Sequence, residues 1–130
     1  MYTHCPDPRK KYTVDEQNRI LTKAIIRMSE RLNFTRQELS TIIGLSEASL
    51  SRLFTQKIYI DPTTKEGQLA ILLLRFFRSL DTLLGGNTQQ CRLWLRSEND
   101  HLHDIPVNLI QSIEGLVFAV QYLDAMRGKN

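Results

Sequence analysis

The side chains best suited to chemistry lie in one short segment, EASLSRLFTQK, at 47–57. If this segment is helical, one of its faces carries small or hydrogen-bonding residues at i, i+3, i+4 and i+7, namely Ala48, Ser51, Arg52 and Thr55. Small residues let a helix lie deep in the major groove of DNA, and an arginine can donate two hydrogen bonds to a guanine. The spacing therefore predicts a DNA-recognition helix.

Neighbouring residues are suited to the DNA backbone. The free N–H groups at the start of the helix, near Ser46 and Glu47, and the ammonium group of Lys57 fit phosphate oxygens. The carboxylate of Glu47 argues against this, because it repels phosphate unless it accepts from a cytosine amino group. The alternative interpretation is a three-helix packing unit that does not touch DNA.

Two short helices joined by a tight turn must position these residues. Thr35 with Glu38 forms a capping box that opens one helix, which ends near Gly44, and Ser46 caps the next helix, at 47–55. Glycine at the turn allows a positive φ and a close backbone approach. We expect the inner side of the pair to consist of Leu39, Ile42, Leu45, Leu50, Leu53 and Phe54.

The segment TRQELSTIIGLSEASLSRLFTQK, 35–57, resembles the Xre/Cro-like helix-turn-helix. The shared pattern is a leucine-bearing helix, a glycine, a hydrophobic residue, a serine and then a polar recognition helix. The resemblance implies that the protein binds operator DNA.

Further helices surround this pair. Thr13 with Glu16 starts a helix at 14–32, after a basic arm at 1–12 that we expect to be flexible. A long helix is expected at about 65–84, within the region 65–86, and eleven of the sixteen residues from Leu69 to Leu84 are apolar. Such a helix is either the central pillar of the fold or a dimer contact. We favour the dimer contact, which would be made by Leu69, Leu73, Phe76 and Leu80.

Gly85-Gly86-Asn87 ends the long helix and marks the best domain boundary. Beyond it we expect short helices at 89–96 and from Pro106, and a last helix at 113–127. The last helix carries two apolar strips, Ile113, Leu116, Val117, Val120 and Leu123, and beside them Phe118, Tyr122, Ala125 and Met126. A small domain can bury the first strip, whereas the second needs another helix, another copy or a partner. The alternative is that both strips are ordinary core.

The segment RLWLRSENDHLHDIPVNLIQSIEGLVFAVQYLDAMRGKN resembles the C-terminal domain of Xre/MbcA/ParS-type antitoxins. The matching positions are Trp94-Leu95, Asn99, Pro106, Leu109, Gly115, Val120, Leu123 and Gly128. One departure is visible at His103-Asp104-Ile105, where family members often carry glycine.

The resemblance implies an antitoxin of a type II toxin–antitoxin system, with a small RES-like, NAD-handling toxin as its partner. It also implies that the C-terminal segment obstructs the toxin's active site and that the protein represses its own operon. The residues expected to bind the toxin are Phe118, Tyr122, Met126, Arg127, Gly128, Lys129 and Asn130. A homodimer is expected because operators are usually two-fold. Two alternatives remain, a stand-alone repressor and an adaptor that docks a non-toxin protein.

Helical spacing recurs along the chain and no long stretch alternates polar and apolar residues, which predicts an all-α protein. The two resemblances imply a helix-turn-helix bundle at 13–64, joined by the long helix to a small toxin-binding domain at 87–130. The net charge of +3 divides unevenly, because 1–60 carries ten Lys and Arg against six Asp and Glu, and 61–130 carries seven against eight. Two distant cysteines, no signal peptide and no membrane-length apolar run favour the cytoplasm.

No catalytic motif accompanies the acidic residues, so we expect neither an enzyme nor a cofactor. His101 and His103 with Asp104 lack further ligands at metal-binding spacing, which favours a solvated loop over a metal site.

Overall fold

The computed structural model describes residues 11–128, and every regular element in this range is a helix. The seven helices are α1 (Val14–Leu32), α2 (Arg36–Ile43), α3 (Glu47–Phe54), α4 (Lys65–Leu83), α5 (Thr88–Arg96), α6 (Pro106–Leu109) and α7 (Ile113–Arg127). A single antiparallel bridge between Asn99 and Asp104 is the only extended pairing in the described part of the chain. The predicted all-α fold class is therefore confirmed. Most of the predicted basic arm, 1–12, lies outside the described residues.

Side-chain caps start the helices where the sequence predicts them. Both capping boxes form, since the hydroxyl of Thr13 accepts from the N–H of Glu16, and Thr35 and Glu38 are paired in the same way. A serine caps each of two later helices, and the Oγ of Ser46 lies 3.1 Å from the N of Ser49 at the start of α3. Each cap satisfies N–H groups that have no partner within the helix, which fixes the start of the helix at one residue.

The turn between α2 and α3 depends on the backbone of Gly44. Its φ of +87° is in the left-handed region, and its N–H donates to the carbonyl of Ser40 at 2.8 Å. A Cβ at this position would meet nothing within 4 Å. The glycine is therefore needed for its positive φ. The expectation that it also permits a close backbone approach is wrong.

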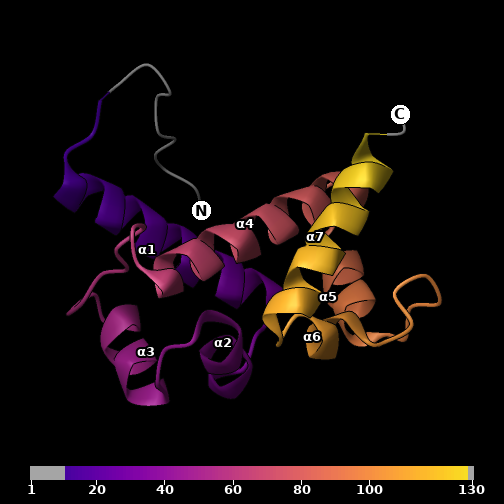
Figure 1. Ribbon diagram of the computed structural model, residues 1–130, viewed down its shortest axis with the longest axis horizontal. Coiled ribbons are helices and arrows are strands. Elements are labelled where there is room, and N and C mark those ends of the chain that lie inside the picture. Colours follow the sequence, from indigo (N-terminus) through magenta and orange to yellow (C-terminus); the bar gives the residue numbers. More distant parts are fainter. Residues whose placement is uncertain (1–10, 129–130) are drawn as a thin grey trace.

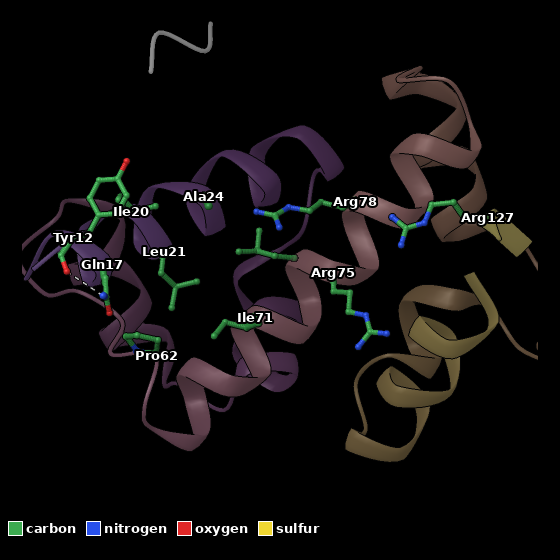
Figure 2. Close-up of a pocket in the computed structure, with 11 residues that line it drawn as sticks. Tyr12, Gln17, Ile20, Leu21, Ala24, Pro62, Ile71, Arg75, Arg78 and Arg127 are labelled. Carbon is green, nitrogen blue, oxygen red and sulfur yellow. Dashed lines mark hydrogen bonds between the residues drawn. The ribbon is translucent and has the colours of Figure 1, made fainter. Parts of the chain in front are cut away.

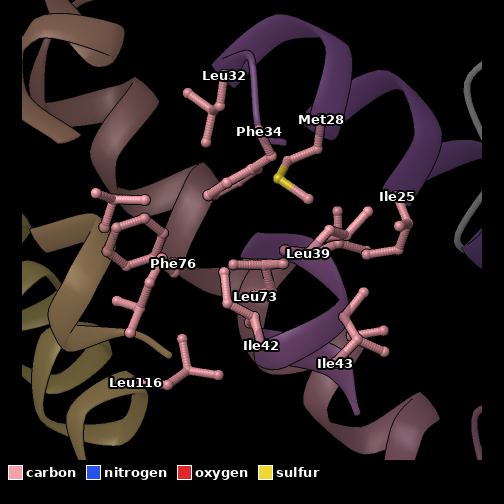
Figure 3. Close-up of a cluster of buried hydrophobic side chains, with 14 of the residues drawn as sticks. Ile25, Met28, Leu32, Phe34, Leu39, Ile42, Ile43, Leu73, Phe76 and Leu116 are labelled. Carbon is pink, nitrogen blue, oxygen red and sulfur yellow. The ribbon is translucent and has the colours of Figure 1, made fainter. Parts of the chain in front are cut away.

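Helix α4 lies at the centre of the molecule. Figure 1 shows α1 crossing beside it, α2 and α3 below, and α7 alongside its C-terminal half. The α4–α7 packing is the most extensive between any two helices of the described chain. Buried side chains from both halves of the chain join in one hydrophobic cluster, which runs from Leu21 on α1 to Leu123 on α7. The close-up in Figure 3 shows Leu73 and Phe76 of α4 between α1, α2 and Leu116 of α7.

This packing overturns the predicted dimer contact at three of its four residues. Leu73, Phe76 and Leu80 are fully buried in the core of their own chain, and Phe76 also lies 6.1 Å from the ring of Trp94. Only Leu69 is partly accessible. Because these side chains are already covered by α1, α2, α5 and α7, α4 is the central pillar of the fold.

Arginine side chains tie α5 to the N-terminal helices. The guanidinium of Arg92 donates to the carbonyls of Arg31 and Glu30, at 2.7 and 3.2 Å, at the end of α1. Arg31 in turn donates to Asp81 at 2.7 Å and to the carbonyl of Gly86 at 2.8 Å. Arg92 thus satisfies carbonyls that α1 leaves open at its C-terminus, where positive charge is favoured.

Candidate DNA-binding and partner-binding surfaces

The recognition helix α3 presents its predicted DNA-binding face to solvent. Leu50 and Leu53 are buried and hold the helix against the core, as the sequence predicts. The seven candidate residues are all exposed: Ser46, Glu47, Ala48, Ser51, Arg52, Thr55 and Lys57. The guanidinium of Arg52 lies 3.4 Å from the Oγ of Ser49, one turn closer to the N-terminus of the helix. The geometry thus leaves a face of small side chains with one arginine accessible to a DNA groove.

Arg36 adds positive charge beside the end of α3. It was not predicted from the sequence as part of the DNA-binding surface. Its guanidinium carbon lies 3.5 Å from the centroid of the Phe54 ring, a cation–π distance. Phe54 packs against the hydrophobic core, as the sequence predicts, but it is only half-buried and also lies under an arginine. The only signal in the sequence was the place of Arg36 directly after the Thr35 cap, at the positive end of α2.

The last helix, α7, buries one strip of side chains against α4. This strip consists of Leu116, Ala119, Val120 and Leu123. The prediction that Ile113 belongs to it is wrong, since Ile113 is 65% exposed at the first turn of the helix. Phe118, from the second strip, is 48% exposed. An aromatic side chain held in solvent on a regular helix is a candidate contact for another protein.

Tyr122 extends this exposed surface toward the loop that precedes α6. Its ring stacks on the ring of His101 with centroids 5.9 Å apart and an interplanar angle of 24°. Asn99 holds the loop, because its side-chain oxygen accepts from the N–H groups of His101 and Leu102 at 2.9 and 3.0 Å. Phe118, Tyr122 and His101 form what we call the aromatic face of the C-terminal half.

Arg127 lies on a different side of α7. Its guanidinium is 3.7 Å from the carboxylate of Asp124 and lines a groove toward α1 and α4. Gly128 is exposed, Met126 is half-buried, and Lys129 and Asn130 lie outside the described residues. The predicted toxin-binding residues therefore do not form a single surface.

Family comparisons match both halves of the chain. Residues 15–75 match the antitoxin Xre-like helix-turn-helix domain, and residues 79–129 match the antitoxin Xre/MbcA/ParS C-terminal toxin-binding domain. The chain belongs to the Xre/MbcA/ParS-type antitoxins. A search of curated proteins finds no match to this antitoxin.

The two matched regions of the antitoxin meet inside α4, between residues 75 and 79. The recognition helix lies in the first region and the aromatic face in the second. This antitoxin thus combines a DNA-binding helix-turn-helix with a toxin-binding domain, and both are built on one shared core.

Cys91 and Asp124 of the antitoxin both belong to the packed structure of the described residues. Cys91 is fully buried, and burial raises the pKa of its thiol, which keeps it protonated. Asp124 accepts from the hydroxyl of Ser79 at 2.6 Å and pairs with Arg75, and both contacts lower the pKa of its carboxyl.

No cluster of three or more potential metal ligands occurs between residues 11 and 128. Within the same range no helix is long and apolar enough to cross a membrane.

Proposed function

We propose that this antitoxin neutralises a RES-like, NAD-handling toxin by direct binding through its aromatic face. The main observation in support is that Phe118 is exposed to solvent within the region that matches the toxin-binding domain. Aromatic residues are enriched in protein interfaces, and truncation of a few of them commonly removes most of the binding energy. The Tyr122–His101 stack gives this surface a second rigid aromatic contact.

Obstruction of the toxin's active site is assigned to the end of the chain, Arg127 to Asn130. A pocket that accepts NAD must accommodate a pyrophosphate, and a guanidinium or ammonium group fits such a pocket. Arg127 is exposed, so its ion pair with Asp124 costs little to break.

We propose that the antitoxin is cytoplasmic and that it represses its own operon by binding DNA through the recognition helix α3. A homodimer would place two copies of α3 in successive major grooves about 34 Å apart. The contact between the copies must use side chains other than Leu73, Phe76 and Leu80, which are buried within each copy.

To test the proposal, NAD is incubated with the toxin encoded beside this antitoxin, and the fall in NAD concentration is measured with and without the antitoxin. We expect the full chain to stop the loss, and Phe118→Asp to weaken toxin binding at least tenfold in calorimetry. Val14→Asp is the control, because Val14 is another exposed hydrophobic residue and lies at the start of α1, outside the toxin-binding region. Truncation after Gly86 is unsuitable, since removal of α7 would uncover the core side of α4.

A variant without residues 127–130 separates binding from obstruction. If obstruction is the mechanism, this variant should still bind the toxin but no longer prevent the loss of NAD. Full inhibition by the shortened chain would contradict obstruction and leave binding alone responsible. Failure of the full chain to bind the toxin would favour a stand-alone repressor.

A further inference from the structure

A groove between α1 and α4 combines an apolar floor with a cluster of arginines. Its cavity has a volume of about 610 Å³. The apolar lining residues are Ile20, Leu21, Ala24, Pro62, Ile71 and Leu74. Figure 2 shows Ile20, Leu21 and Pro62 at one end of the groove, and Arg75, Arg78 and Arg127 toward the other. No described residue of α2 or α3 lines this groove, so it is separate from the recognition helix.

A second cavity, of about 210 Å³, continues the groove past Arg78. The two cavities share Ala24, Leu74 and Arg78, and the second adds Arg27 and Arg31. The described lining of the continuous groove therefore contains five arginines and no aspartate or glutamate. Such a concentration of one charge along a cleft attracts an anionic partner.

The charge of the groove is only partly neutralised within the chain. Arg31 pairs with Asp81, and Arg75 and Arg127 share the single carboxylate of Asp124. Arg78 forms no hydrogen bond or ion pair with any other residue of the described range. Beside it, Ile71 is 46% exposed on the floor of the groove. Binding of an amphipathic anion would cover this apolar surface and pair the free guanidinium in one step.

The length and shape of the groove point to a helix. Gln17 and Arg31, the limits of the lining on α1, are about 21 Å apart along the helix axis, which corresponds to about four helical turns. We propose that the groove binds an acidic amphipathic helix of a partner protein. The apolar side of this helix lies on Ile71 and Leu74, and its carboxylates pair with Arg75 and Arg78.

Other occupants fit the groove less well. A second copy that used the same groove in a two-fold contact would leave the arginines unpaired, because the described lining of the groove contains no carboxylate. A DNA backbone would match the charge but would gain nothing from the apolar floor, because its phosphates stay hydrated. An acidic amphipathic helix satisfies both features.

The test uses the full chain and a fluorescein-labelled 16-residue peptide that is stapled as a helix. The peptide carries leucine at i, i+3, i+4 and i+7 on one side and glutamate at flanking positions. Fluorescence anisotropy should give saturable binding, which Arg78→Glu and Ile71→Asp each weaken at least tenfold. Lys23→Glu is the matched control, because Lys23 is an exposed cation on α1 outside the groove lining. It should change the affinity by less than threefold.

Three results would overturn the proposal. The first is absence of saturable binding, and the second is equal affinity for a peptide with the same residues in scrambled order. The third is displacement of the peptide by a random DNA duplex of 20 base pairs, together with loss of duplex binding in Arg78→Glu. This result would assign the groove to nucleic acid. Circular dichroism of each variant verifies that the helices persist.

Discussion

The guanidinium of Arg96 on α5 forms two hydrogen bonds, both 2.9 Å long, with the carboxylate of Glu38 on α2. Glu38 is also the third residue of α2, where its carboxylate accepts from the backbone N–H of Thr35 at 2.9 Å. One side chain therefore completes the capping box of α2 and attaches the toxin-binding region to the helix-turn-helix. Arg96 also donates to the carbonyl of Asn33, which fixes the turn between α1 and α2.

This double role makes the stability of the antitoxin depend on pH through Glu38. The hydrogen bonds from Arg96 lower the pKa of the Glu38 carboxyl from its ordinary value of 4.5. A lowered folded-state pKa means that unfolding takes up a proton, so the stabilisation is complete above the ordinary value and is lost as the pH falls through the folded value. Glu38→Gln should lower the free energy of unfolding by about 1–2 kcal/mol at neutral pH.

The measurement is urea unfolding of both proteins followed by circular dichroism from neutral pH down to about pH 3. The difference between them should shrink as the acid end is approached. Asp15→Asn, which removes an exposed carboxylate paired with Arg19, serves as the control and should cost little at any pH. A Glu38→Gln deficit that persists unchanged in acid would contradict the ion pair as its cause.

Substitution of Leu73 tests whether α4 is the pillar of the chain or a contact between chains. Because Leu73 is fully buried, Leu73→Ala should cost about 2–5 kcal/mol of unfolding free energy. Leu72→Ala, at a half-buried neighbour, should cost less. Light scattering should give the same oligomeric state for all folded forms. A Leu73→Ala protein of normal stability but with weaker self-association would restore α4 as the interface.

The thiol of Cys91 reports on the opening of the shared core. We expect a Cys5→Ser protein to react with a disulfide reagent only as fast as Cys91 becomes exposed by unfolding, since burial also raises the pKa of this thiol. The absorbance of the released thiolate gives the rate. Reaction should accelerate with urea in parallel with unfolding. Rapid reaction in native buffer would mean that α5 opens independently of the rest.

Local features made the helix boundaries predictable. A capping box such as Thr13 with Glu16 depends on residues three apart, so the sequence alone specifies it. The burial pattern of α4 was not predictable in this way, because eleven of sixteen residues around the helix are apolar and no single face is marked. Only the packing of α1, α2, α5 and α7 on α4 determines that Phe76 is buried while Ile71 is exposed.

The two candidate surfaces also differ in whether they could be predicted from the sequence. The exposed face of α3 follows from the spacing within one helix, so Ser51 and Arg52 could be identified from sequence. The arginine groove could not, since Arg78 and Arg127 come from helices that are adjacent only in the folded chain. In the sequence, Arg78 is one of a few polar interruptions in an apolar run.

Two substitutions on the DNA-binding side separate base recognition from phosphate contact. Arg52→Ala should reduce the preference for operator over random DNA by about 1–3 kcal/mol, because Arg52 lies on the exposed face of α3. Lys57→Ala should weaken binding to both DNAs equally and lower the slope of log K against log salt by about one. Anisotropy titrations with both duplexes at several salt concentrations measure the two effects. If both variants lose affinity for both duplexes equally, Arg52 contacts only the phosphate backbone, and the specificity must come from other residues of α3.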